Sequence, residues 1–280
     1  METSKKNDML VLIKGAGDLA SGVALRLFRA GLRVAMTDLP VPTAIRRTVS
    51  FCPAITEGFA RVEDAVARLA HTKAEAEKIW ADGEIPVFAD PEAKMLTELR
   101  PDVLVDAVLA KRNAGTAITD APIVLALGPG FTAWEDCHAV IETMRGHDLG
   151  RVYYNGSALP NTGVPGEIGG YAAERVMHAP AAGVFHGIRE IGDLVEAGKT
   201  IALVGGAAVV TPIAGVLRGL LADGVYAPEG MKCADVDPRA KREHCFTVSD
   251  KARSLGGSVL EAIGALGGFR LSINGEESAK

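Results

Sequence analysis

A chain of 280 residues, 48% of them hydrophobic, has enough apolar material to bury the core of one large domain or two ordinary ones. Its 30 Lys and Arg residues against 35 Asp and Glu residues give a formal net charge of −5, which argues against binding to nucleic acid or to an anionic membrane. The polar N-terminus lacks a signal-peptide core, and no segment reaches the roughly 18 apolar residues of a membrane span, so a cytoplasmic protein is expected.

Short apolar runs recur along the first half of the chain, separated by segments with helical spacing. Continuous rather than alternating apolar residues are typical of strands in a parallel sheet that is covered on both faces. The first half therefore predicts a Rossmann-like α/β domain, with a helix between Gly17 and Gly31 after the first strand. The expected strands are 9–14, 33–38, 85–90, 102–110 and 122–128.

The sequence Gly-Ala-Gly-Asp-Leu-Ala, residues 15–20, follows the first expected strand. In a dinucleotide-binding unit, Gly15 would form the tight turn, Gly17 would let a ligand approach the backbone, and Asp38 would meet a ribose hydroxyl. Asp18 is unusual there, because a carboxylate repels a pyrophosphate unless it is paired, and capping of the helix is its other interpretation. The alternative for the whole unit is a tight strand-to-helix turn without a ligand.

Further loops with basic residues and glycines are expected at the same edge of the sheet. Residues 110–113 and 128–131 each follow an expected strand, and ligands of open α/β sheets bind outside the carboxyl ends of the strands. Basic side chains there would pair with phosphate, and a Gly-Pro-Gly turn would let the backbone approach it. An anionic ligand is therefore expected, although each basic residue alone reads as a solvated surface charge. The residues in question are Arg46, Arg47, Lys111, Arg112, Gly128 and Gly130.

The second half contains an internal repeat. Residues 179–204 and 211–236 align with identical glycines at expected turns and with short apolar strands between them. The pattern resembles the barrel-sandwich fold of biotinyl and lipoyl carrier domains. In those carriers the modified lysine lies on the hairpin that joins the two halves. Residues 204–210 contain no lysine, so no covalent biotin or lipoyl group is expected and the module is interpreted as a docking surface.

The sequence contains no motif typical of a hydrolase or a metal site, and the catalytic residues, if any, stay unknown. The four cysteines form no Cys-x-x-Cys pair and are expected to be free thiols. For Cys245, beside His244, a catalytic or metal-binding residue is weighed against a buried core residue. Transfer of sulfur or selenium by the free thiols is left open. A final helix is expected to begin at Ser249 or Asp250 and to run towards Ala265.

Long segments of the chain match one known family. They are LIKGAGDLASGVALRLFRAG, AIRRTVSF, ALGPGF, HAVIETMRGHDLGRV, NTGVPGEIGGY, DVDPR, CFTVSDKAR and GGSVLEAI. Together they resemble the YqeB family, which is associated with selenium-dependent molybdenum hydroxylase systems and is distant kin of the Rossmann-type chaperone XdhC. The resemblance implies a cytoplasmic maturation factor that prepares, holds or inserts a modified molybdenum cofactor, with a molybdenum hydroxylase as its client.

The sequence thus predicts an α/β protein with a Rossmann-like domain over residues 1–172 and a barrel-sandwich β module with a C-terminal helix over residues 173–280. The expected guest is the molybdenum cofactor or a nucleotide, without a separate metal site. One alternative is an NAD(P)-dependent oxidoreductase that uses the same loop, and another is a scaffold whose Rossmann domain is empty. Homo-oligomerisation is left open. The expected ligand-binding residues are Gly15, Gly17, Asp18, Asp38, Arg46, Arg47, Lys111, Gly128 and Gly130.

Overall fold

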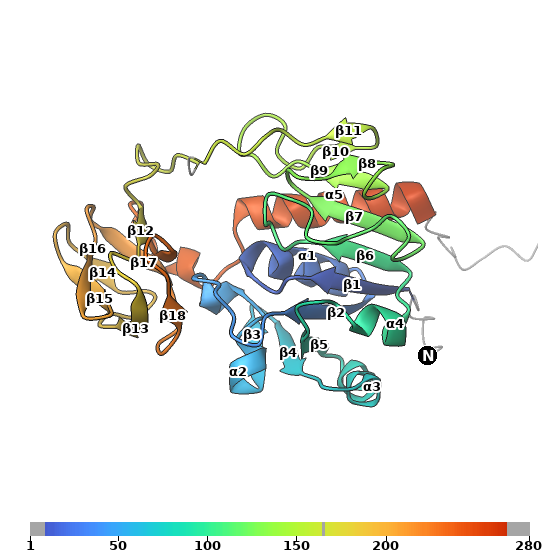
Figure 1. The fold of residues 1–280 in the computed structure, drawn as a ribbon, viewed down its shortest axis with the longest axis horizontal. Helices are drawn as coiled ribbons and strands as arrows, with labels where there is room; N and C mark the ends of the chain where they lie inside the picture. The colour runs from blue at the N-terminus through green and yellow to red at the C-terminus, as the bar shows by residue number, and fades with distance from the viewer. Residues whose placement is uncertain (1–8, 164–165, 268–280) are drawn as a thin grey trace, which may run out of the picture.

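The computed structural model describes residues 9–163 and 166–267 (Figure 1). The fold is mixed α/β, with a large and mainly parallel sheet in the first half of the chain and two antiparallel sheets in the second half. The antiparallel sheets form a β module that lies beside the large sheet, on the left of Figure 1. Among the described residues, no helix is long and apolar enough to cross a membrane.

The large sheet has nine strands in the order β10-β9-β7-β6-β1-β2-β5-β4-β3. They are β1 (Leu10–Lys14), β2 (Arg33–Asp38), β3 (Phe59–Val62), β4 (Ala65–Leu69), β5 (Ile85–Ala89), β6 (Val103–Asp106), β7 (Ile123–Leu127), β9 (Ala139–Ile141) and β10 (Val152–Tyr153). All pairings from β9 across to β4 are parallel, and antiparallel pairs add β10 and β3 at the two edges. The predicted parallel sheet is therefore confirmed, and its central strands β1, β6 and β7 are buried along their whole length.

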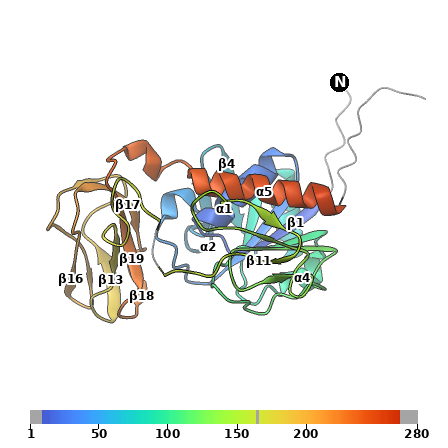
Figure 2. The same cartoon turned by 90° about the horizontal axis from the view of Figure 1, so that it is seen from above.

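Helices cover both faces of this sheet. One face packs in a core with α1 (Asp18–Arg29) and α5 (Asp250–Gly267), which lie side by side in Figures 1 and 2. The other face packs against α3 (Lys73–Ala81) and α4 (Met95–Leu99). The remaining short elements are α2 (Ala54–Glu57), the 3₁₀ turns Arg47–Val49 and Arg242–Cys245, and the two-stranded sheet of β8 (Thr132–Ala133) and β11 (Gly156–Ser157).

The predicted final helix is present as α5. The prediction assigned it to the β module, but it packs against the large sheet and α1. It packs against α1 through glycines that leave no room for a side chain. A Cβ added at Gly22 would lie 2.5 Å from the Cβ of Ala252, and one added at Gly256 would lie 2.8 Å from the Cβ of Arg26. The C-terminal segment therefore returns to the parallel sheet and completes its core, because the apolar face of α5 is buried there.

The β module is built from the repeated segments. Its strands are β12 (Val176–His178), β13 (Gly183–Gly187), β14 (Leu194–Val195), β15 (Thr200–Val204), β16 (Ala207–Val210), β17 (Gly215–Leu220), β18 (Tyr226–Ala227) and β19 (Lys232–Asp237). In the repeat alignment, β13, β14 and β15 correspond to β17, β18 and β19. The short strand of each repeat pairs with a long strand of the other repeat: β14 pairs with β17, and β18 pairs with β13. The repeat is thus visible as two interlocked halves.

The predicted barrel-sandwich fold is wrong. The described strands of the module form two separate four-stranded sheets, in the orders β12-β19-β17-β14 and β16-β15-β13-β18, and no pairing between them closes a barrel. The repeated glycines and apolar runs are local signals, and they correctly predict where strands and turns lie. Sheet closure depends on pairing between distant strands, which a local repeat does not specify.

A short segment after β2 joins the module to the large sheet. The backbone N–H of Leu220 donates to the carbonyl of Ile45 at 2.7 Å, and the Nε of Arg47 donates to the carbonyl of Leu220 at 2.8 Å. The hydroxyl of Thr48 donates to the carbonyl of Cys245 at 2.5 Å. The side chain of Ile45 is buried in the core of the module rather than in that of the sheet. Residues 45–48 therefore fix the module beside the carboxyl edge of the sheet.

Candidate ligand-binding site

Two adjoining cavities lie at the carboxyl edge of the parallel sheet. The smaller one, called here the loop pocket, has a volume of about 320 Å³ and is lined by the glycine loop, Asp38 and the residues that follow β5 and β6. The larger one, called here the cleft, has a volume of about 770 Å³ and is lined by residues of both the sheet and the β module. Asp18, Leu19 and Leu109 line both cavities. A ligand that fills the loop pocket would therefore reach the cleft by passing the start of α1.

The two glycines of the loop have different roles. Gly15 has a φ of +96°, and a Cβ there would lie 2.9 Å from the carbonyl oxygen of Ala107, so only glycine fits this turn. Gly17 has an extended backbone with a φ of −71°, and a Cβ there would meet only the Cβ of Ala44, at 3.8 Å. The protein itself leaves room for a side chain at Gly17. Because Gly17 has no side chain, the wall of the loop pocket stays open there.

Asp38, at the end of β2, holds the glycine loop in place. Its Oδ2 accepts a hydrogen bond from the backbone N–H of Ala16 at 2.6 Å, and its Oδ1 accepts one from the N–H of Leu39 at 2.7 Å. Burial raises the pKa of this carboxyl, and the two hydrogen bonds oppose the rise. Each carboxylate oxygen has a further lone pair, so Asp38 keeps the capacity to accept a bond from a ligand hydroxyl.

The loop pocket has apolar walls and an acidic lining. Leu39 and Val108 line it and are each more than two-fifths exposed, which leaves apolar surface for a planar ring. Asp38 and Asp90 contribute carboxylates. The only basic residue among those that line it is Lys14, whose Nζ donates to the hydroxyl of Thr116 at 2.6 Å and lies 3.5 Å from Asp106. This pocket suits an uncharged ring and sugar better than a phosphate.

Arg46 and Arg47 do not lie beside Asp38 as cations for an additional phosphate. Arg46 lines the cleft, where its Nη1 lies 3.5 Å from Oδ2 of Asp18 and its Nη2 donates to the carbonyl of His244 at 2.9 Å. Arg47 lines neither cavity and instead bonds to Leu220 across the junction with the β module. Of this pair, only Arg46 is placed to meet an anion.

The loops 110–113 and 128–131 pack against each other at the rim of the cleft. A Cβ added at Gly130, where φ is +105°, would lie 2.5 Å from the Cα of Arg112. One added at Gly128 would lie 2.7 Å from Oγ1 of Thr143. These two glycines therefore permit close packing inside the protein rather than close approach of a ligand. Of the basic pair in the first loop, Lys111 lines the cleft and Arg112 does not.

The cleft is strongly cationic, although the whole chain is acidic. Seven cationic side chains line it against three carboxylates, those of Asp18, Glu142 and Asp235. The cations are Arg46, Lys111, Arg145, Arg175, Arg218, Lys232 and Lys251. Of these, only Arg46 and Lys111 are among the ligand-binding residues expected from the sequence. The others come from the β module, from the segment after β9 and from the start of α5, and only the tertiary fold brings them to this edge.

Three of the seven cations form ion pairs with aspartates. Arg145 forms a two-bond pair with Asp250, with both distances at 2.8 Å. In the β module, Arg175 and Arg218 both bind the buried carboxylate of Asp235, the latter at 2.7 Å. These pairs explain how the guanidinium groups are tolerated at low exposure.

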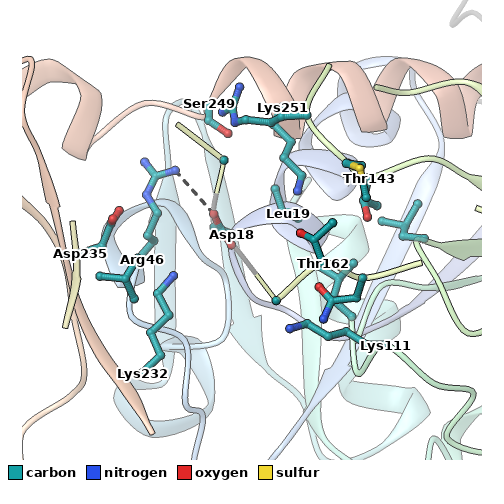
Figure 3. A pocket seen from close by; sticks show the side chains of 18 of the residues that line it. Asp18, Leu19, Arg46, Lys111, Thr143, Thr162, Lys232, Asp235, Ser249 and Lys251 are labelled. Carbon is teal, nitrogen blue, oxygen red and sulfur yellow. Dashed lines mark ion pairs between the residues drawn. The ribbon is translucent and has the colours of Figure 1, made fainter. Parts of the chain in front are cut away.

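The other four cations have much weaker compensation. Arg46 has only Asp18 as a carboxylate partner, and its Nε is buried with no hydrogen-bond partner among the described residues. Lys111 has the amide oxygen of Asn161 at 3.2 Å, once that amide is oriented to satisfy both its atoms. The ammonium groups of Lys232 and Lys251 form no ion pair within the described part of the chain. Figure 3 shows all four side chains around Asp18.

Burial lowers the pKa of several of these cations. For Arg46 and Lys251, burial is the main cause, and the nearby carboxylate of Asp18 opposes it. For Lys232, burial again lowers the pKa, opposed first by Asp235. A pKa lowered by burial means that the charged form lacks compensation, which a bound anion would supply.

The four cysteines are free and buried. Burial raises the pKa of all four thiols, to about 12 for Cys137 and about 11 for Cys233. The thiol of Cys245 donates to the carbonyl of Leu217 at 3.7 Å. This geometry favours the core interpretation of Cys245 over a reactive thiolate. Among the described residues, no group of three or more His, Cys, Asp or Glu side chains is arranged to hold a metal ion.

Solved structures share little with this fold. An aspartoacylase family protein from Mesorhizobium loti is 12% identical, with a TM-score of 0.26 over 82% of this chain and 85% of that chain. A succinylglutamate desuccinylase/aspartoacylase from Rhodobacter sphaeroides is 16% identical, with a TM-score of 0.27 over the same shares. Likenesses at this level carry no argument about the activity of this chain.

A curated protein is strongly similar to this chain. No protein-family profile matches the chain. It is 52% identical over 254 residues to the "Uncharacterized protein YqeB" of Escherichia coli (strain K12), an alignment that covers 91% of this chain and 47% of that protein. The chain thus spans about half the length of this relative. Over the aligned residues, the chain is thus closely similar to a YqeB protein.

Proposed function

We propose that this protein binds a nucleotide-type ligand across the glycine loop and acts as an accessory protein in the maturation of molybdenum hydroxylases, with a nucleotide-bearing or phosphorylated pterin cofactor as its guest. The ring and sugar would lie in the loop pocket, and the phosphate would point past Asp18 into the cleft. The observation that carries the proposal is the pairing of an acidic, partly apolar pocket with a cationic cleft on either side of one loop.

Gly17 and Asp38 support the position of the ligand. Gly17 leaves space that no protein atom needs, and the backbone N–H groups of the first turn of α1 begin beside it. Asp38 has the free acceptor capacity that a sugar hydroxyl requires. The described residues of the cleft fit the phosphate part of such a cofactor, because cations with weak compensation meet there.

The maturation role rests on the family resemblance, and the shape of the cleft is compatible with it. A carrier must hold a cofactor and later release it to a client enzyme, and a cavity between two modules opens when one module moves. The client would be a molybdenum hydroxylase. Because the chain spans about half of its YqeB relative, its partners are part of the proposal.

A second candidate, an NAD-dependent oxidoreductase, is favoured by Asp38 at the end of β2, the position that meets a ribose hydroxyl in NAD-binding domains. NADP is disfavoured, because Asp38 and Asp90 are acidic and Arg46 and Arg47 point elsewhere. A phosphate on the ribose would find carboxylates, and the one lysine that lines the pocket, Lys14, is already paired with Asp106.

Mass spectrometry of small molecules released from the natively purified and then denatured protein tests the proposal. It is combined with titration of NAD(H), NADP(H) and pterin nucleotides into the emptied protein. A released pterin or pterin nucleotide, with no nicotinamide affinity, is the expected result. Micromolar binding of NAD(H) without pterin binding would overturn the accessory role in favour of the oxidoreductase.

A further inference from the structure

We propose that the cleft is a polyphosphate site, which holds a ligand tail of two or more linked phosphate groups between the parallel sheet and the β module. The proposal deepens the proposed function and rests on it for the position of the nucleoside end. It concerns the four cations of the cleft that have the weakest compensation by carboxylates. They are Arg46, Lys111, Lys232 and Lys251.

The charge balance of the cleft points to more than one phosphate. Seven cations and three carboxylates line the cleft, and Asp250, the partner of Arg145, reduces the excess to three positive charges. Asp237, which also pairs with Arg218, is balanced by Arg239. One phosphate monoester carries at most about two negative charges, and it would leave part of this positive charge unmatched. A diphosphate or triphosphate tail matches it better.

Arg46 provides an observation independent of the charge count. Its side chain is only 9% exposed, and its Nε is buried with no hydrogen-bond partner among the described residues. Its nearest carboxylate, Asp18, lies 3.5 Å away, which is longer than a direct charge-assisted hydrogen bond. A buried guanidinium with an unused donor is costly unless a ligand completes its bonds. Figure 3 shows this guanidinium at the edge of the cavity, directed towards Asp18.

Two helices begin at the cleft and add to the attraction. Asp18 and Leu19 of α1 line it on one side, and Ser249 and Lys251 line it at the start of α5. The first N–H groups of a helix lack acceptors within the helix and carry partial positive charge. An anion in the cleft would therefore meet backbone donors as well as the four cations.

The cations come from segments that are far apart in the sequence. Lys111 follows β6, Lys251 is in the first turn of α5, and Lys232 is the first residue of β19 in the β module. A tail that contacts all three would span both modules. Because the cleft and the loop pocket share Asp18, Leu19 and Leu109, such a tail is continuous with a nucleoside in the loop pocket.

The test is calorimetric titration of the full chain with AMP, ADP, ATP, inorganic tripolyphosphate and citrate, at about 0.15 M salt to limit non-specific attraction. The nucleotide series is repeated with cytidine nucleotides. We expect affinity to rise at least tenfold from the monophosphate to the triphosphate. Tripolyphosphate should bind alone, and citrate, a trianion without phosphate groups, should bind at least tenfold more weakly.

A double variant and a matched double control locate the site. Replacing both Lys232→Gln and Lys251→Gln should lower triphosphate and tripolyphosphate affinity at least tenfold and leave monophosphate affinity within twofold. The exposed lysines Lys94 and Lys199, which line neither cavity, serve as controls, and K94Q with K199Q should change nothing. Circular dichroism melting of each variant verifies that it folds.

The outcomes separate the two proposals. Equal binding of monophosphate and triphosphate, or citrate as strong as tripolyphosphate, overturns the polyphosphate site while the nucleotide pocket stands. Tripolyphosphate binding that needs Lys232 and Lys251, without binding of any nucleotide or pterin nucleotide, supports the cleft and overturns the proposed ligand of the loop. Absence of all binding overturns both.

Discussion

The carboxylate of Asp18 lies 3.5 Å from the guanidinium of Arg46, and the pair stands at the point where the loop pocket opens into the cleft. Asp18 is the first residue of α1, where a negative charge is favourable, and Arg46 follows β2 in the segment that joins the β module. The pair resolves the difficulty that a carboxylate raises beside a phosphate. Asp18 compensates Arg46 while no anion is bound.

Replacing Asp18→Asn should tighten the binding of tripolyphosphate by about threefold to tenfold, because it removes the one carboxylate that competes for Arg46. Calorimetric titration without divalent cations measures the effect. Thermal melting of the variant measures how far loss of the charge destabilises the N-terminus of α1. Weaker binding by D18N would show that the carboxylate assists the anion rather than competing with it.

The two glycines of the loop should separate folding from binding. Gly17→Ala has room in the protein and an allowed backbone, so it should melt close to the parent temperature while its Cβ weakens ligand binding by about tenfold or more. Gly15→Ala should instead destabilise the fold by roughly 1–3 kcal/mol, because φ is +96° and the Cβ meets a carbonyl.

The matched control is Gly257→Ala in α5, where an added Cβ meets nothing within 4 Å and should leave binding unchanged. Full nucleotide affinity in G17A, measured by titration, would contradict the role of this glycine as the open wall of the pocket.

Much of the parallel sheet was predictable from the sequence. The apolar runs that end at Lys14 and Asp38 are continuous, and short runs of this kind are typical of central strands in a parallel sheet. The turn between the first strand and α1 was predictable for the same reason, because Gly15 is required by a local backbone angle. The roles of Gly17 and Asp38 in ligand binding stay predictions.

The closure of the β module and the position of the last helix were not predictable from local patterns. Gly256 packs against Gly22 and Arg26, which lie far away in the sequence, so the residues around Gly256 do not reveal the contact. The same limit applies to the site. Lys232 and Lys251 look like ordinary surface lysines in the sequence, and only the docking of the module beside α5 places them in one cavity.

Affinity for polyphosphate should fall as pH rises, and it should do so below the ordinary lysine pKa of about 10.4. Burial lowers the pKa of Lys232 and of Lys251, so each loses its proton at a lower pH than an exposed lysine, and the attraction for the anion disappears with it. Titrations between pH 7 and 10, with the charge of tripolyphosphate itself accounted for, measure the decline.

The double variant of Lys232→Gln and Lys251→Gln is the control for this pH dependence. Its weaker binding should change little over the same interval, because the titrating groups are absent. An equally steep decline in the variant would assign the pH effect to other groups and contradict the role of these lysines.

The stability of the β module should depend on Asp237. Its carboxylate is fully buried and accepts bonds from Arg218 at 3.1 Å and from Arg239 at 2.6 Å. Burial acts to raise its pKa, but the hydrogen bonds and charges of the arginines outweigh it and hold the pKa at about 2. This lies below the unfolded value of about 3.9, so the contribution is complete above that pH and is lost as pH falls towards 2. This difference in pKa corresponds to roughly 2.5 kcal/mol of stability.

Replacing Asp237→Asn should therefore do two things in denaturant unfolding experiments. At pH 7 it should lower the free energy of unfolding by about 3–5 kcal/mol, because Arg218 loses one of its buried partners and Arg239 is left without one. Between pH 4 and pH 2 the variant should lose less stability than the parent chain, since the carboxylate whose protonation costs the parent stability is gone. An unchanged acid dependence in D237N would contradict the assignment. Replacement of the exposed Asp64 by Asn, far from the module, is the matched control, because it removes a carboxylate without uncovering a buried arginine.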